Sequence, residues 1–238
     1  MNTSQNKLSV LRLDIAYASY KLIKEIAYYS PLRRFFFYRY RYMFSPQQLA
    51  FFLNCIDDTR GLPGAILEIG CALGHTTVWL NKHLDTTGIE KDYFCIDTFA
   101  GFTRNDTDFE VKQREKEANL MRMSGVGLSV NRKKWFDRTM QDNGISRVRS
   151  LQGDIGTLQV KTITPRISFC LIDVDLYLPV KAALEQVYPL MDKNGIIVVD
   201  DCKSDNIFDG AYQAYSEFIS QKGLEEKIVQ EKLGVIYT

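Results

Sequence analysis

The sequence predicts an α/β protein built on a doubly wound, mostly parallel sheet of seven strands, preceded by an N-terminal helical arm. From residue 65 onward, short apolar runs alternate with segments of helical spacing, which is the pattern of β-α units. A glycine-rich turn joins the first run to a helix, as in doubly wound sheets. The last two runs are joined by a short turn, which adds an antiparallel strand pair. We therefore divide the chain into an arm, residues 1–43, and one α/β domain, residues 44–238.

The composition is that of an ordinary globular protein, with 238 residues, 45% of them hydrophobic and 25% charged. The net charge is +1, so no basic field predicts a nucleic-acid partner. No apolar run approaches the ~20 residues of a transmembrane helix. The five cysteines are scattered and form no CxxC pair. This usage is typical of a reducing compartment, so we expect a cytoplasmic protein.

The arm combines a helical segment with a basic and aromatic run. Apolar residues recur at helical spacing over Leu8–Tyr29, and residues 33–42 are all arginine or aromatic. This run can form a patch for a membrane surface or an acidic partner. Alternatively, it packs on the domain or on a second subunit, with its arginines at the rim. The run is short and no second membrane signal accompanies it, so we favour the second interpretation and expect a homo-oligomer formed through the arm.

The remaining elements follow from apolar runs bounded by glycine, proline and aspartate. Strands are expected over residues 65–69, 93–97, 147–152, 167–172, 196–199, 227–231 and 235–237. Helices are expected over residues 47–59, from residue 76, and over 131–143, 179–191 and 210–221. Residues 101–130 form an insertion, either a cover over the site with Gly125 and Gly127 as hinges, or a solvated surface helix.

The turn after the first strand reads Glu68-x-Gly70-x-x-x-Gly74. Glycines at such a turn let a ligand approach the backbone closely. The spacing differs from the Gly-x-Gly-x-x-Gly of dinucleotide sites, and the carboxylate before the first glycine suits a ligand with a cationic amino-acid end. The pattern resembles motif I of class I S-adenosylmethionine (SAM) methyltransferases, although a strand–turn–helix without a ligand accounts for it equally well. Asp97 ends the second strand, where an acid hydrogen-bonds ribose hydroxyls.

Aspartates also follow the later strands. Asp154 follows the third, Asp173 and Asp175 the fourth, and Asp200 and Asp201 the fifth. Because the fourth and fifth strands are neighbours in a doubly wound sheet, the last four carboxylates meet at one edge and raise each other's pKa. A divalent cation resolves this conflict, and carboxylate oxygens suit Mg²⁺. The alternative is that individual aspartates cap the helices that follow, which explains the Asp200-Asp201 pair less well.

An ordered set of motifs from Phe44 to the C-terminus resembles the macrocin O-methyltransferase (TylF-like) family. The motifs are Asp97-Thr-Phe-Ala-Gly-Phe102, Gly-Asp-x-x-Thr-Leu at 153–158, Leu171-Ile-Asp-Val-Asp-Leu-Tyr177, Tyr188-Pro-Leu and Asn194-Gly-Ile-Ile-Val-Val-Asp-Asp201. The resemblance implies a Rossmann-like class I methyltransferase domain over residues 44–238. It also implies that the domain uses SAM and Mg²⁺ to methylate a hydroxyl of a small molecule, such as a sugar or a glycosylated natural product.

The same resemblance assigns roles to residues. Asp173, Asp200 and Asp201 would be the metal ligands, and Asp175 the general base. SAM would be held by residues at the glycine turn and the strand ends: Glu68, Gly70, Gly74, His75, Asp97, Thr98, Gly153, Asp154 and Asp173. The histidine is either a SAM-positioning group, a base, or a satisfied helix-terminus side chain, and we favour the last. Two departures from the family's pattern fall near the expected acceptor pocket: Cys202-Lys203 and Tyr212.

Two other functions use the same features. A nicotinamide-dependent oxidoreductase would use the glycine turn and Asp97, but the dinucleotide fingerprint is missing and the paired aspartates would have no role. A non-catalytic interaction protein on the same scaffold has no need of the intact set of acids. The sequence therefore favours the O-methyltransferase and does not identify its acceptor.

Overall fold

The computed structural model describes residues 3–31, 33, 42–119, 121, 129–204 and 207–238. They belong to two compact units, Met1–Arg41 and Tyr42–Thr238, which are considered separately. The first unit contains helix α1 (Thr3–Tyr29), where the apolar spacing predicts a helix. Ile15, Leu22 and Ile26 are exposed on it. Of the basic and aromatic run, residues 34–41 lie outside the described part. Within that part, no helix has the length and hydropathy of a bilayer span.

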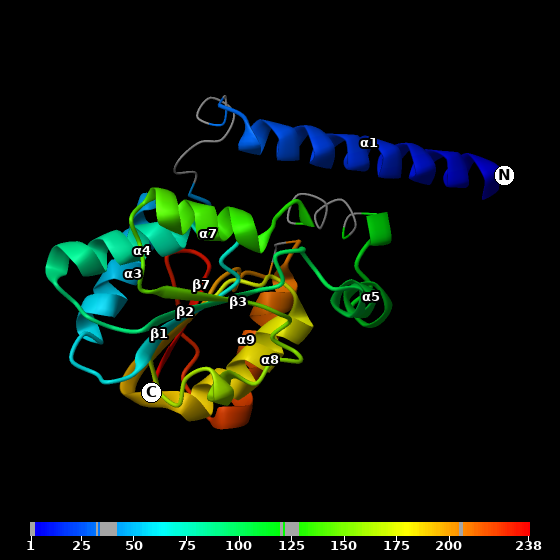
Figure 1. Cartoon of the computed structure of the whole chain (residues 1–238). Helices are drawn as coiled ribbons and strands as arrows, with labels where there is room; N and C mark the ends of the chain where they lie inside the picture. The colour runs from blue at the N-terminus through cyan, green and yellow to red at the C-terminus, as the bar shows by residue number, and fades with distance from the viewer. Residues whose placement is uncertain (1–2, 32, 34–41, 120, 122–128, 205–206) are drawn as a thin grey trace. The chain divides into compact units, whose positions relative to one another are not determined.

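The second unit is built on a sheet with helices packed around it (Figure 1). The sheet has seven strands in the order β3-β2-β1-β4-β5-β7-β6. The strands are β1 (Ala65–Ile69), β2 (Tyr93–Asp97), β3 (Val148–Gln152), β4 (Ile167–Ile172), β5 (Met191–Val199), β6 (Ile228–Val229) and β7 (Leu233–Tyr237). Strands β1 to β5 pair in parallel, and β7 runs antiparallel to both β5 and β6. The doubly wound, mostly parallel sheet is confirmed. Its strand order reverses at β1 and β4, where such folds bind ligands.

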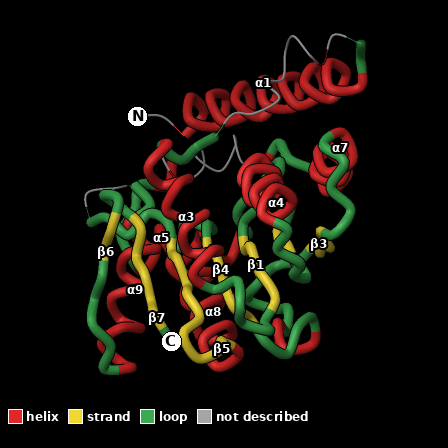
Figure 2. Tube along the Cα trace, turned by 90° about the vertical axis from the view of Figure 1, so that its left-hand side faces the viewer, coloured by secondary structure: helices red, strands yellow, loops and turns green. Residues whose placement is uncertain are grey.

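Helices cover both faces of this sheet (Figure 2). One face carries α3 (Pro46–Asp58), α4 (His75–Thr87) and α7 (Lys133–Asp142), and the other carries α8 (Tyr177–Val187) and α9 (Asp209–Lys222), with α5 (Arg104–Gln113) against α8. Successive residues of a strand point to opposite faces. Leu67 therefore shares a core with Val180 of α8, whereas Ile66 shares one with Leu80 of α4.

Two predicted boundaries differ from the structure around β5. Helix α8 ends at Val187, and a 3₁₀ turn (Tyr188–Leu190) leads directly into the strand. The strand begins at Met191 instead of Ile196. Met191 pairs with Ile167 of β4 and Ile196 pairs with Phe169, so the pairing register shifts between Met191 and Ile196. The skipped residues form a bulge in which Asn194 has a φ of 66°. The Asn-Gly pair therefore marks a bulge inside a strand and not the end of a helix.

The described part of the insertion is fastened to the domain. Within the expected insertion, helix α5 spans Arg104–Gln113. Oε1 of Glu110 accepts a hydrogen bond from the backbone N–H of Tyr177 at 2.8 Å. The Arg114 guanidinium binds both Glu110 and Asp209, the latter at 2.8 Å. This helix is thus anchored to α8 and α9. The glycines predicted as hinges lie outside the described residues: Gly125 and Gly127.

Candidate functional site

Close backbone contacts shape the glycine turn after β1. Gly70 has a φ of 88°, and a Cβ there would lie 1.8 Å from the backbone oxygen of Asp173. Gly74 has a φ of 80° at the N-cap of α4, and its Cβ would lie 2.6 Å from the Cε of Met140. Only glycine fits either position. The turn therefore connects β1 to α4 and packs against Asp173, the residue that follows β4.

Glu68 lies beneath this turn, 1% exposed, on the face of β1 that meets α4. Its Oε2 accepts hydrogen bonds from Oγ1 of Thr77 at 2.7 Å and from the Tyr93 hydroxyl at 2.8 Å. Burial raises the pKa of Glu68 to about 7, and the two hydrogen bonds oppose this rise. Glu68 therefore ties β1 to α4 and β2, and its contact with SAM stays a prediction.

Asp97 holds two loops at the carboxyl edge. Its Oδ2 accepts the backbone N–H of Ala72, in the glycine turn, at 2.7 Å. Its Oδ1 accepts the N–H of Phe99, in the loop after β2, at 2.6 Å. Burial raises the pKa of Asp97, and these backbone hydrogen bonds lower it. The carboxylate thus lies beside the glycine turn, where a ribose contact requires it, and the contact itself stays a prediction.

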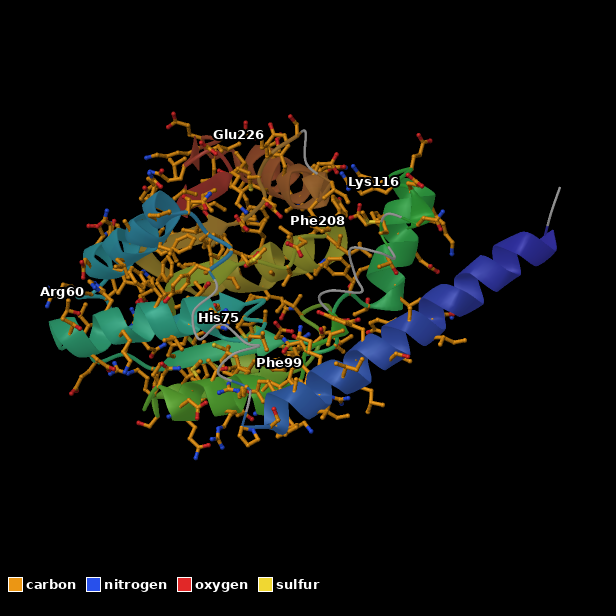
Figure 3. All side chains as sticks on the ribbon, turned by 90° about the horizontal axis from the view of Figure 1, so that it is seen from above. Arg60, His75, Phe99, Lys116, Phe208 and Glu226 are labelled. Carbon is orange, nitrogen blue, oxygen red and sulfur yellow. The ribbon has the colours of Figure 1, made fainter. Side chains whose placement is uncertain are left out.

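The other residues assigned to SAM lie on the loops that follow β2 and β3 and at the start of α4. Thr98 directly follows β2, and its Oγ1 donates to a backbone carbonyl of its own loop at 2.7 Å. The N–H of Gly153 donates to the backbone oxygen of Asp97 at 2.9 Å. Asp154 accepts the N–H of the residue two positions on at 2.8 Å. His75 is the first residue of α4 and is half-buried (Figure 3).

The predicted cluster of aspartates forms where β4 and β5 end side by side. Asp173 and Asp175 follow β4, and Asp200 and Asp201 follow β5. Lys232, in the turn between β6 and β7, donates from Nζ to Oδ2 of Asp200 at 2.8 Å and to Oδ1 of Asp201 at 2.9 Å. Oδ1 of Asp200 is buried and has no hydrogen-bond partner in the part of the chain that the structure describes.

The neighbouring carboxyl groups raise the pKa of Asp173 and of Asp175. The pKa of Asp175 rises to about 8 through burial and then through Asp201 and Asp200. Burial, followed by Asp200 and Asp175, holds the pKa of Asp173 well above its usual range. Lys232 opposes both shifts. One ammonium group therefore offsets only part of the negative charge that four ionised carboxylates would carry.

Backbone strain is concentrated at the same edge. Four non-glycine residues with positive φ each follow a parallel strand by two or three positions: Ala72 at 45°, Phe99 at 50°, Asp175 at 64° and Asp201 at 55°. Such conformations are uncommon outside glycine and cluster at functional sites. Their position at the ends of β1, β2, β4 and β5 marks this edge as the candidate active site.

The three aspartates predicted as metal ligands do not form a preassembled metal site in this structure. Within the described ranges, no three Asp, Glu, His or Cys side chains converge so that they could hold a metal ion. The fold does bring Asp173, Asp200 and Asp201 to one edge, but the Lys232 ammonium bridges the last two. Their role as metal ligands stays a prediction.

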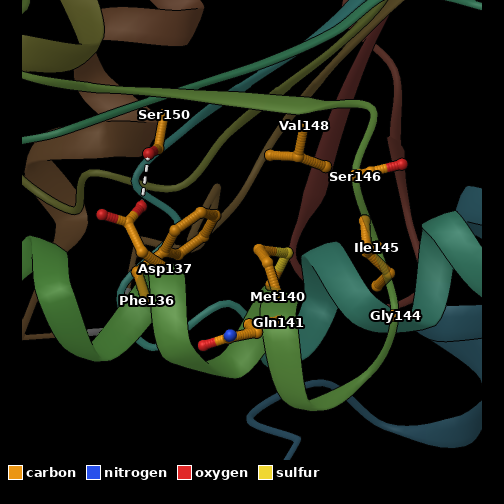
Figure 4. Close-up of a pocket in the computed structure, with 9 residues that line it drawn as sticks. All are labelled: Phe136, Asp137, Met140, Gln141, Gly144, Ile145, Ser146, Val148 and Ser150. Atoms are coloured by element: carbon orange, nitrogen blue, oxygen red, sulfur yellow. Dashed lines mark hydrogen bonds between the residues drawn. The ribbon is translucent and has the colours of Figure 1, made fainter.

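A surface pocket lies between α7 and β3 (Figure 4). It is lined by Phe136, Asp137, Met140, Gln141, Gly144, Ile145, Ser146, Val148 and Ser150. The Ser150 hydroxyl donates to Asp137 at 2.7 Å across it. None of the residues predicted for SAM, metal or catalysis lines this pocket, so it contributes nothing to the candidate site.

Sequence reasoning missed Lys232 and the partners of Glu68. Thr77 and Tyr93 read as ordinary helix and strand residues, and a buried acid on β1 was the only sign that hydrogen-bond donors must surround it. Lys232 lies in a turn, where a lysine is usually solvated. Only the pairing of β7 with β5 brings it to the aspartates. Of the Cys202-Lys203 pair that departs from the family pattern, Cys202 is buried and Lys203 is exposed.

Comparison with solved structures identifies the fold. The O-methyltransferase NovP is 16% identical, with a TM-score of 0.67 over 82% of this chain and 81% of that protein. CalS11, a calicheamicin methyltransferase, is 18% identical, with a TM-score of 0.59 over 80% of this chain and 78% of the CalS11 chain. The S-adenosylhomocysteine (SAH)-bound methyltransferase PaMTH1 of Podospora anserina is 17% identical, with a TM-score of 0.52 over 82% of this chain and 79% of that protein. No curated protein matches the chain.

The family comparison goes further than the fold. The family model described as macrocin-O-methyltransferase (TylF) matches residues 41–237, which include every strand and every residue of the candidate site. The match decides against the oxidoreductase and the non-catalytic scaffold. The chain belongs to the macrocin O-methyltransferase family and is a SAM-dependent O-methyltransferase.

Proposed function

We propose that this enzyme methylates a hydroxyl group of a sugar or of a glycosylated natural product, and that it does so with Mg²⁺. The observation that carries the proposal is the cluster of four aspartates beside the glycine turn, at the edge where ligands of such sheets bind. The acceptor class is supported by CalS11, which is described as a TDP-rhamnose 3'-O-methyltransferase. Residues 44–238 would carry the whole reaction.

SAM would bind along the carboxyl ends of β1, β2 and β3. We assign Gly70, Gly74 and His75 to its amino-acid end, because they surround the start of α4. Asp97 would accept hydrogen bonds from the ribose. The remaining contacts would come from the adjacent loops and from the end of β4: Thr98, Gly153, Asp154 and Asp173. Glu68 would hold the first turn of α4 beside the SAM site through its hydrogen bond with Thr77.

The donor chemistry of the cluster fits Mg²⁺. Asp173, Asp200 and Asp201 offer carboxylate oxygens, which this cation prefers. Oδ1 of Asp200 is buried without a hydrogen-bond partner among the described residues, and a cation would satisfy it. These three residues would hold the ion. When bound, Mg²⁺ would lower the pKa of an acceptor hydroxyl.

Asp175 would then take the proton of that hydroxyl. Burial, Asp201 and Asp200 raise its pKa to about 8 in the metal-free protein, and a bound cation would lower this pKa toward that of a base that works near neutral pH. Asp175 has a φ of 64° and lies two residues before α8. The surrounding loops would exclude water and align the acceptor oxygen with the methyl group of SAM.

The test is methyl transfer from radiolabelled SAM to a panel of TDP-sugars, with Mg²⁺ or with EDTA. Binding of Mn²⁺ serves as the probe of the magnesium site. Asp175→Asn should slow turnover by roughly 10²–10⁴-fold, as expected for a lost base, and should still bind Mn²⁺. Asp200→Asn and Asp201→Asn should lose both turnover and Mn²⁺ binding. Calorimetry should give wild-type SAM affinity for all three variants.

The matched control is Asp92→Asn, an exposed carboxylate just before β2, at the opposite end of the sheet. It should leave turnover unchanged. Methyl transfer at the full rate in EDTA would remove Mg²⁺ from the proposal. Activity towards other hydroxyl acceptors but no TDP-sugar would overturn the acceptor class alone.

We also propose a cytoplasmic homo-oligomer that assembles through the arm. The five cysteines all lie in the described part of the chain and are free and buried, as suits a reducing compartment. The exposed apolar side chains of α1 support assembly.

A further inference from the structure

The further inference concerns Lys232, and it rests on the magnesium site proposed above. The Nζ atom of Lys232 lies between two predicted ligands, 2.8 Å from Asp200 and 2.9 Å from Asp201. Asp200 and Asp201 are 6% and 8% exposed, so their charges are largely withdrawn from water. Buried carboxylates without a counter-charge are strongly destabilising. The lysine supplies this charge within the folded chain itself.

We propose that Lys232 is a built-in counter-ion that takes the magnesium position in the metal-free enzyme, and that Mg²⁺ binds by displacing its ammonium group. Both cations would draw on the same two carboxylates, because Lys232 already binds Oδ2 of Asp200 and Oδ1 of Asp201. Two cations in contact would repel each other strongly in a buried site. Binding of one therefore requires departure of the other.

The side chain of Lys232 is able to leave while its backbone stays in place. Its backbone oxygen accepts the N–H of Cys202 at 2.7 Å. The preceding turn is fixed by Gln48, whose side chain donates to the backbone oxygen of Gln230 at 3.1 Å. The Lys232 side chain is 25% exposed and borders solvent. Its ammonium also lies over the Phe44 ring, 5.4 Å from the ring centroid. The four-carbon stem is flexible, so the ammonium can turn outward.

Oδ1 of Asp200 indicates that Lys232 is a replaceable cation and does more than neutralise the aspartates. This atom is buried and has no hydrogen-bond partner among the described residues, although Lys232 binds the other oxygen of the same carboxylate. An ammonium group has three N–H donors and is a compact cation. It leaves this oxygen unsatisfied, whereas a divalent ion with several oxygen ligands would satisfy it. The lysine therefore holds the site without completing it.

The first test measures Mn²⁺ affinity by calorimetry on the full-length protein without SAM. Lys232→Met should bind Mn²⁺ about tenfold tighter or more, because no internal cation competes. Lys227→Met removes the same charge from an exposed position near the same hairpin and should match the wild type. Equal Mn²⁺ affinity for Lys232→Met and wild type would overturn the exchange and leave the metal site standing. Absence of Mn²⁺ binding by every protein would overturn the magnesium site as well.

The second test uses the wild type and does not depend on the folding of a variant. Reductive methylation followed by mass spectrometry reports how accessible each lysine amine is. Lys232 should be protected in EDTA and several-fold more labelled in saturating Mg²⁺, while Lys227 should be labelled equally in both. Equal labelling of Lys232 in both conditions, in protein that binds Mn²⁺, would show that the ammonium stays and would overturn the proposal.

Discussion

At the scale of single residues, Glu68 shows how an acid near an active site serves the fold. Its carboxyl group is almost fully buried and accepts hydrogen bonds from Thr77 and Tyr93 on neighbouring elements. Because burial penalises the charged form, its pKa lies near 7 in the folded protein. The folded state therefore holds a proton that the unfolded chain releases at lower pH, and this makes stability depend on pH.

The sign of this dependence follows from the raised pKa. The stabilising contribution of neutral Glu68 is complete below its unfolded pKa and is lost as the pH rises through about 7. Glu68→Gln is neutral at every pH and keeps an oxygen acceptor for Thr77. Between pH 5 and pH 8 its free energy of unfolding, relative to the wild type, should rise by about 2 kcal/mol.

Urea denaturation at the two pH values measures this difference, since all other titrating groups are common to both proteins. The exposed Glu90→Gln supplies the control and should show no comparable trend. If the free energies of unfolding of Glu68→Gln and the wild type differ by the same amount at pH 5 and pH 8, then Glu68 is ionised at both pH values.

At the scale of elements, helix α5 illustrates a buried ion network that fastens an insertion to the domain. The side chains of Arg114 and Glu110 are 9% and 2% exposed, and Arg114 also binds Asp209 at the start of α9. Phe109 stacks on Tyr177 with ring centroids 5.2 Å apart. Helix α5 is therefore anchored at Tyr177, two residues after Asp175 of the candidate site.

Arg114→Met should destabilise the protein by about 3–5 kcal/mol, because it leaves the buried Glu110 carboxylate without a counter-charge. Removing both charges in Glu110→Gln/Arg114→Met should recover a large part of this loss. Lys112→Met, on the exposed face of the same helix, should change stability by less than about 0.5 kcal/mol. Urea denaturation measures all three variants, and a double variant as unstable as Arg114→Met would contradict this account.

How far the sequence predicts the fold also differs from element to element. Strands β1, β2 and β4 are mostly apolar runs that end at glycine or aspartate, so the local sequence pattern predicts their bounds to the residue. The start of β5 is hidden, because its bulge carries an Asn-Gly pair that also ends helices. The edge where Asp173 and Asp200 meet is predictable from topology. The presence of Lys232 there is not, because it depends on how a distant hairpin pairs with β5.

At the scale of the whole molecule, the arm and the domain are separate compact units. Helix α1 has 27 residues and exposes Ile15, Leu22 and Ile26 at 59%, 61% and 63%. A helix turns by about 100° per residue, so these three side chains lie on one face. Isolated helices are marginal in water, and a helix of this kind is stabilised by packing its apolar face. A second copy of the arm offers the same apolar face in return.

If the arm carries assembly, light scattering should give the full-length protein a mass that is a multiple of 27.4 kDa. Deletion of residues 1–41, or the substitutions Ile15→Gln, Leu22→Gln and Ile26→Gln together, should give a monomer with unchanged SAM affinity. Tyr20→Gln removes a side chain that is 54% exposed and lies about 140° away around α1, so it should leave the mass unchanged. A truncated protein that keeps the full-length oligomeric state would move assembly to residues 42–238 and leave the arm with a different partner.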